Sequence, residues 1–172
     1  MKFTKLLAAA AVAAVAMGSQ SAMAADATAS ASATVVAPIA INKTADLNFG
    51  TLVAPAAASV VTVIVSEVDG ARSGTATLGS GTGTAASFTV SGEGASTYSF
   101  VIDDTALSPP VGMSVELDTS LAIAGVLTTT GTLVAGEQVV TVGGTLTVDG
   151  DDYVAGVGLK NLGSFTATVA YN

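Results

Sequence analysis

The chain has no cysteine, no histidine and no tryptophan among its 172 residues, and only 5% of it is aromatic. Without histidine or cysteine there is no thiolate nucleophile, no Ser-His-Asp triad and no zinc site of nitrogen and sulfur ligands. Five basic residues against thirteen acidic ones give a net charge of −8, so a basic surface for nucleic acid is also missing. These absences predict a protein that is not an enzyme, that has no cofactor or metal and that does not bind nucleic acid.

The first 24 residues are predicted to be a secretory signal peptide. Lys2 and Lys5 precede an apolar run over residues 6–17, and Ala22-Met23-Ala24 is a small-x-small cleavage pattern. The apolar run is shorter than the roughly 20 residues that a membrane-spanning helix needs, and no later run is long enough. We expect cleavage before Ala25, passage through the periplasm, and a place on the cell surface or outside the cell.

Cleavage would leave 148 residues with three basic and thirteen acidic side chains, a net charge of −10. A single domain of this length buries roughly 68–70% of its unfolded surface, which is enough for a proper core. Small exported domains often carry disulfides, and this chain cannot form one. Its stability must come from packing, from hydrogen bonds within sheets or from contacts with other chains.

Apolar residues recur with period two in several segments, which is typical of strands with one buried face. Residues 164–171 show it most clearly, with Phe165, Ala167, Val169 and Tyr171 at the odd positions. The same alternation appears in residues 86–91, 97–102 and 138–148. Within the last of these segments, Gly143-Gly144 suggests a bulge.

Residues 60–65 form a continuous β-branched run, which favours a central strand covered on both faces. Asp69-Gly70 and Asp149-Gly150 are predicted to be hairpin turns, and Ser108-Pro109-Pro110 must be a loop because proline cannot continue a ladder. The glycine-rich residues 79–83 lack the lysine and the helix of a phosphate loop, so they are predicted to be a hairpin loop. Eight to ten short strands at this spacing predict one all-β, antiparallel sandwich domain over residues 35–172.

Acidic residues gather in three places, at Asp103-Asp104, at Glu116 with Asp118, and at Asp149-Gly150-Asp151-Asp152. Loop carboxylates are the ligands that Ca²⁺ takes, but none of these spacings matches the EF-hand loop or the nonapeptide calcium repeat. We interpret them as solvated carboxylates of turns.

From Ala25 to Ile41 every odd position is apolar and most even positions are polar. Seventeen residues at about 3.3 Å each would span roughly 56 Å, whereas strands usually have about 5–6 residues. We therefore expect a break near Pro38 or Val35-Val36, with a first domain strand after it and a strand-patterned extension, residues 25–34, before it.

Two interpretations of the extension stay open. It is either a flexible tail whose Ala/Ser/Thr alternation reflects low complexity, or a donor strand that pairs with an open sheet edge of the next copy. In the second case its small apolar side chains would face a shallow groove between the sheets: Ala27, Ala29, Ala31, Ala33 and Val35.

Seven short motifs together resemble a bacterial exported family catalogued only as a domain of unknown function. They are Thr34-Val35-Val36-Ala37-Pro38-Ile39-Ala40-Ile41, Asp46-Leu47-Asn48-Phe49-Gly50, Arg72-Ser73, Ala86-Ser87-Phe88-Thr89-Val90-Ser91-Gly92, Tyr98-Ser99-Phe100, Gly144-Thr145-Leu146-Thr147-Val148, and the last nine residues from Ser164 to Asn172. The resemblance covers nearly all of the chain after the signal peptide.

That family is similar to self-assembling pilins and to spore-coat-like pilus subunits. The resemblance implies an immunoglobulin-like β-sandwich, an aromatic residue next to the C-terminus (here Tyr171), and an N-terminal extension that completes the fold of a neighbour. The sequence lacks the disulfide of common pilins, and Gly158 is one place away from the glycine usual in chaperone-assembled subunits. These departures weigh against assembly by a chaperone and usher.

We therefore expect a structural subunit of a surface fibre of the pilus or fimbria kind, with a role in adhesion or biofilm, that polymerises by donor-strand exchange with copies of itself. The expected interface joins Ala27, Ala29, Ala31 and Ala33 of the extension and the adjoining Val35 to Phe165, Val169 and Tyr171 on the inward face of the last strand. The alternative is a monomeric adhesin or matrix protein that contacts carbohydrate through its loops. The scarcity of aromatic side chains weighs against that alternative.

Overall fold

A computed structural model describes residues 25–119, 130–153 and 156–172, so the predicted signal peptide lies outside the described residues. The chain divides into two units, residues 1–34 and residues 35–172. In the first unit, residues 25–34 have no regular secondary structure and all their side chains are exposed. The described residues include no helix that could cross a membrane.

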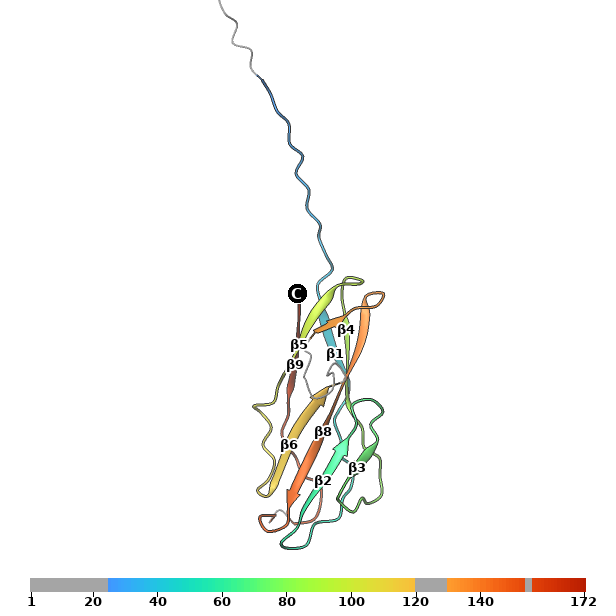
Figure 1. Cartoon of the computed structure of the whole chain (residues 1–172), viewed down its shortest axis with the longest axis vertical. Coiled ribbons are helices and arrows are strands. Elements are labelled where there is room, and N and C mark those ends of the chain that lie inside the picture. Colours follow the sequence, from blue (N-terminus) through green and yellow to red (C-terminus); the bar gives the residue numbers. More distant parts are fainter. Residues whose placement is uncertain (1–24, 120–129, 154–155) are drawn as a thin grey trace, which may run out of the picture. The chain divides into compact units, whose positions relative to one another are not determined.

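The second unit is an all-β domain, as predicted, and the number of its described strands falls within the predicted range. The nine strands are β1 (Ala40–Ala45), β2 (Val60–Val65), β3 (Arg72–Gly74), β4 (Ala86–Ser91), β5 (Thr97–Asp103), β6 (Met113–Thr119), β7 (Thr130–Thr132), β8 (Glu137–Asp149) and β9 (Thr166–Tyr171). They form two antiparallel sheets in the manner of a β-sandwich (Figure 1).

The larger sheet is organised by β8, which has thirteen residues. The strand order is β1-β4-β8-β2-β3, and β6 also pairs with β8. The first half of β8 pairs with β4, from Glu137 to Val142, and the second half pairs with both β2 and β6. The smaller sheet has the order β7-β5-β9.

The smaller sheet packs on only one half of the larger one, and this produces two cores. The sandwich core lies between β4, the first half of β8 and the smaller sheet; its buried members are Ala86, Phe88, Val90, Tyr98, Phe100, Leu133, Val140 and Val142. The loop-covered core lies on β2 and the second half of β8; its buried members are Phe49, Val63, Val65, Ala76, Leu146 and Val148. No residue of β5, β7 or β9 belongs to the loop-covered core. Figure 1 shows β2 and β3 near one end of the domain, beneath the part where β4 and β5 lie.

Four sequence predictions need correction. β2 is not covered on both faces, because Val60 and Ile64 are 58% and 39% exposed while Val63 and Val65 are buried. The β-branched run reflects strand propensity, and solvent covers its outer face. Asp69-Gly70 does connect the paired strands β2 and β3 as predicted. Asp149-Gly150, however, does not make a hairpin, because the next described strand is β9 in the other sheet.

There is also no bulge at Gly143-Gly144. The pairing of β8 with β6 runs through both glycines without a shift in register. A Cβ atom on Gly143 would overlap the carbonyl oxygen of Val65, and one on Gly144 would lie against the carbonyl oxygen of Glu116. The two glycines therefore permit a close approach of three backbones. Residues 79–83 are likewise no hairpin loop, because they lie in the connection between β3 and β4, which do not pair.

Candidate subunit interface

β9 has the alternation that its sequence predicted. Ala167, Val169 and Tyr171 are half-buried, whereas Thr166, Thr168 and Ala170 are exposed. Together with Phe165, the half-buried residues pack against the sandwich core. The structure thus brings Phe165, Val169 and Tyr171 onto one inward face, as expected.

β9 is an edge strand, because it pairs with β5 and with no other described strand. At its two ends, Ser164 N–H donates to Ala106 C=O and Asn172 N–H donates to Thr97 C=O, so the even-numbered residues face β5. Backbone polar groups alternate in direction along an antiparallel strand. The N–H and C=O groups of residues 165, 167 and 169 consequently point away from β5, toward a free edge.

A cleft of about 260 Å³ adjoins this edge. We call it the β1–β9 cleft, because it is lined by the edge strands of both sheets and by the core beneath them: Ile41, Lys43, Phe88, Phe165, Thr166 and Ala167. Phe88 and Phe165 meet edge to face, with ring centroids 6.2 Å apart. Among the described residues no ladder joins β1 to β9, so main-chain hydrogen bonds do not link the two described sheets on this side.

The side chain of Tyr171 connects three distant segments near the end of β9. Its hydroxyl accepts a hydrogen bond from Glu93 N–H at 2.6 Å and donates one to Ala37 C=O at 2.8 Å. The Glu93 carboxylate in turn accepts a bond from Ala37 N–H at 3.3 Å. A Cβ atom on Gly92 would overlap the tyrosine hydroxyl, so glycine is required there. We call this arrangement the Tyr171 bridge.

The family comparison identifies this domain. Residues 39–171 match the model of a family described as a domain of unknown function, DUF4402. The chain belongs to this family. The match includes all nine described strands and ends at Tyr171. Neither the curated proteins nor the solved structures gave a match.

The remaining predicted interface residues precede the matched DUF4402 region. Four of these residues belong to the first unit, where their side chains are exposed and the backbone forms no strand: Ala27, Ala29, Ala31 and Ala33. Val35 belongs to the second unit and is 93% exposed. The first strand of the DUF4402 domain begins at Ala40, just after the predicted break at Pro38.

Sequence reasoning missed the partners of Tyr171, namely Ala37, Gly92 and Glu93. They are separated from it by between 78 and 134 positions, and hydrogen bonds to main-chain groups leave no residue-type signature. The Gly92-Glu93-Gly94 sequence shows only that a turn occurs there.

Several acidic side chains accept hydrogen bonds at turns or loops, but the interpretation as turn carboxylates is wrong for Glu116 and Asp118, which lie within strand β6. Asp103 accepts bonds from the N–H and the hydroxyl of Thr105, and these bonds lower the pKa of Asp103. The N–H of Ala71 similarly lowers the pKa of Asp69. Asp151 accepts a bond from Ala58 N–H. Among the residues described, no three acidic side chains lie close enough to hold a metal ion.

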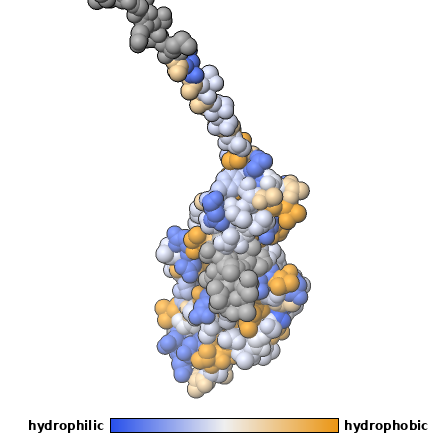
Figure 2. Space-filling model, turned by 45° about the horizontal axis from the view of Figure 1, so that its top comes forward, coloured by the Kyte–Doolittle hydropathy of each residue, from blue (hydrophilic) through white to orange (hydrophobic). Residues whose placement is uncertain are grey.

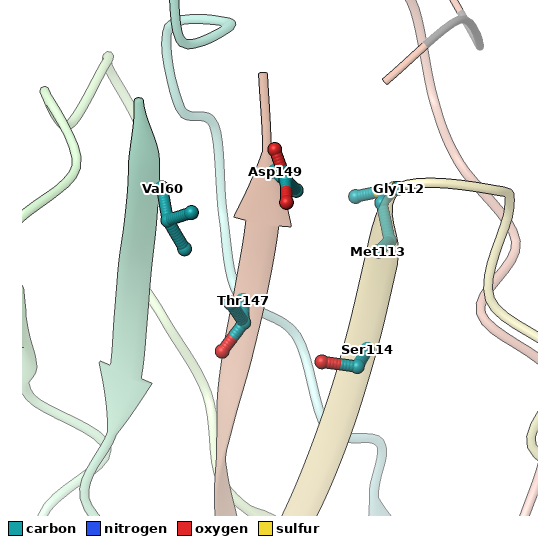
Figure 3. Close-up of a pocket in the computed structure, with 6 residues that line it drawn as sticks. All are labelled: Val60, Gly112, Met113, Ser114, Thr147 and Asp149. Carbon is teal, nitrogen blue, oxygen red and sulfur yellow. The ribbon is translucent and has the colours of Figure 1, made fainter. Parts of the chain in front are cut away.

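A second hollow of about 260 Å³ lies on the outer face of the larger sheet (Figure 3). Side chains of Val60, Ser114 and Thr147 come from three neighbouring strands, and Asp149 lies at the end of β8. No aromatic residue lines the hollow, and Asp149 already accepts a hydrogen bond from Asp151 N–H. The hollow thus lacks the flat ring against which a sugar would stack.

Proposed function

We propose that this DUF4402 protein is a structural subunit of an exported, homopolymeric surface fibre, in which the N-terminal extension of one copy adds a strand to the next copy. One observation supports this proposal above the others. The same chain carries an exposed segment with strand alternation and, in its domain, an unpaired strand edge beside a cleft that apolar residues line together with Lys43 and Thr166.

The chemistry of the extension matches such an edge. A strand added beside β9 would direct alternate side chains inward to the cleft and outward to water. The extension has alanine at its odd positions and mainly Thr and Ser at its even ones. Its alanines suit a shallow cleft whose floor is the Phe88–Phe165 pair. Because alanine buries little area, the backbone hydrogen bonds must supply much of the affinity, at roughly 0.5–1.5 kcal/mol net for each.

The surface supports strand addition over the docking of an apolar face. Figure 2 shows hydrophobic residues on the visible face as small separate groups among hydrophilic ones. Several large exposed apolar side chains are isolated valines in turns or loops, such as Val68 and Val111. Scattered residues of this kind do not mark a docking surface.

Electron microscopy with negative stain tests the proposal directly. Purified protein comprising residues 25–172 should form fibres and give a ladder on SDS gels of unheated samples, and deletion of residues 25–33 should abolish both. A single monomeric species for the intact protein, or a ladder that survives the deletion, would overturn the proposal. A monomer that binds glycans in a saturable way would instead support the carbohydrate-binding alternative.

A matched pair of variants separates the alternation from the mere presence of the extension. In one variant Asp replaces Ala27, Ala29, Ala31 and Ala33; in the other, Asp replaces Thr28, Ser30, Ser32 and Thr34. Both variants gain four negative charges. The first should reduce fibre yield at least tenfold, because it turns carboxylates toward the apolar side chains of Phe88, Phe165 and Ala167, and the second should retain most of the yield.

A further inference from the structure

The edge strands of the domain differ in how well they are protected. Natural sheets protect their edges with charged residues, proline, bulges or short strands. β1 carries Lys43, a register shift between Lys43 and Ala45, and Pro38 shortly before it. β6 carries Glu116 and Asp118, and β3 and β7 have three residues each. β9 has six residues with no charge, no proline and no register shift against β5.

We propose that β9, not β1, accepts the incoming extension, along residues 165–169, and that the Tyr171 bridge ends this acceptor edge and thereby fixes the register of the incoming strand. This inference rests on the proposed fibre function. It names the edge that is used, the stretch of that edge and the residue that limits it.

The acceptor stretch follows from the direction of the backbone groups. Residues 165, 167 and 169 present their N–H and C=O groups to the free edge, and the cleft lies beside residues 165–167. Five residues of strand span about 17 Å. About half of the ten-residue extension can therefore pair, with its alanines opposite Phe165, Ala167 and Val169, and the rest is left to link two domains.

The limit follows from the position of the tyrosine side chain. Tyr171 reaches from β9 to the main chain of Ala37 and Glu93, so its ring spans the gap between the end of β9 and the segment that leads into β1. Gly92 leaves no spare room beside the hydroxyl. An incoming strand that continued past Val169 would have to place its inward side chain where this ring lies. The strand must therefore stop before Tyr171 while the bridge is intact.

Disulfide mapping tests both the choice of β9 as the acceptor edge and the role of the Tyr171 bridge in ending it. The method suits this chain because it has no cysteine of its own. Thr168 is exposed on β9, and a residue directly opposite it on an added antiparallel strand would have its Cα about 4.5 Å away, within the range of a disulfide. Chains carrying Thr168→Cys together with Thr28→Cys, Ser30→Cys or Ser32→Cys should be oxidised during assembly and separated on non-reducing gels. One of the three combinations should give at least tenfold more linked oligomer than the other two.

Asn42→Cys in place of Thr168→Cys tests the competing edge. Asn42 is exposed on β1, and chains with this cysteine should give at least tenfold less linked oligomer. If fibres form and the links run through Asn42, the acceptor assignment is wrong while the fibre function stands. If neither fibres nor links form, both proposals fail.

Tyr171→Phe tests the limit, because it removes the hydroxyl and keeps the ring. The preferred cysteine combination should move by two residues, or spread over neighbouring combinations, since the Tyr171 bridge no longer holds the ring in place. Tyr153→Phe is the matched control, because the Tyr153 hydroxyl bonds Gly156 C=O in the other half of the domain. It should leave the preferred combination unchanged.

An unchanged preference in Tyr171→Phe would overturn the role of the bridge. Glu93→Ala removes only the carboxylate that bonds Ala37, so it should shift the preference in the same direction by a smaller amount. This second variant decides the question if Tyr171→Phe does not fold.

Discussion

The two halves of the domain bury the same kind of strand in different ways. In one half the inward residues of β4, β5 and β8 meet between two sheets. In the other half the inward residues of β2, β6 and β8 lie beneath long connections. β8 runs through both halves, and Val140, Val142, Leu146 and Val148 on its inner face are all buried. The inner face of β8 is therefore buried by the smaller sheet in one half and by long connections in the other.

The connections over the loop-covered core are held together by Arg72 at the start of β3. Its guanidinium donates to the carbonyl oxygens of Phe49, Thr51, Gly79 and Gly81. These carbonyls belong to the two connections that cover the loop-covered core, and backbone bonds such as Gly79 N–H to Thr51 C=O join the same segments. The planar fork of arginine provides several donors in fixed directions, so one side chain can gather several loop carbonyls.

The difference between the two halves also explains why the candidate interface lies in the half with two sheets. Two sheets leave their edge strands unpaired on the open side, where β1 and β9 line a cleft. In the other half, loops tied by Arg72 supply the cover, and the smaller sheet contributes no edge there. A site for strand addition needs an unpaired edge, and the better one belongs to the smaller sheet.

The largest expected effect comes from truncating one core residue in each half. Phe100 and Leu146 are 1% and 2% exposed, one in each core. Phe100→Ala should lower the free energy of unfolding by about 3–5 kcal/mol, and Leu146→Ala by about 2–3 kcal/mol. The second value is smaller because leucine loses fewer buried atoms than phenylalanine and because the loops above Leu146 can collapse into the cavity. Denaturant titration measures both, and a larger loss for Leu146→Ala would contradict the distinction between the halves.

An intermediate effect is expected from Arg72. Arg72→Ala should cost about 2–3 kcal/mol, because four carbonyls lose a charged donor. Arg72→Lys should recover less than half of this loss, since an ammonium group lacks the planar fork. Hydrogen exchange should increase in residues 47–53 and 75–85 and stay unchanged in β5 and β9. Equal increases in both halves would show that Arg72 does not act locally.

The smallest effects concern two of the three described alanines with positive φ, one taken from each half. Ala135 has φ 53° in the turn between β7 and β8, and Ala58 has φ 59° in the loop before β2. Glycine relieves this strain, so Ala135→Gly should stabilise the domain by about 0.5–1 kcal/mol. Ala58→Gly should give a smaller gain, because a loop relaxes its strain more easily than the two-residue turn that the Val134–Glu137 bridge closes. Melting temperatures of the two variants test the order.

Period-two alternation in the sequence correctly predicted the inward residues wherever one face of a strand packs against a core. The alternation in β4, β5 and β9 predicted Phe88, Phe100 and Val169 on inward faces, and the structure places them there. The β-branched run of β2 was misleading, because valine and isoleucine favour strands whether the second face meets protein or solvent. The glycines of β8 were misread for a related reason, since a close approach of backbones involves partners distant in sequence.

The candidate site also combines features that the sequence pattern predicts with features that it does not. The inward residues of β9 could be predicted from period two alone, whereas the extension has the same alternation without a strand in the structure. The cleft could not, because it depends on which strands of each sheet end up at an edge. The roles of Tyr171 and Arg72 could not be predicted either, because both bond main-chain carbonyls, which every residue carries.

The sequence by itself therefore determined the strand class, the inward faces and the absence of histidine and cysteine, because side-chain alternation and composition are local properties. The tertiary structure decided which strands pair, which edge stays free and which half is covered by loops. Those features depend on contacts between segments distant along the chain, and no local pattern encodes them.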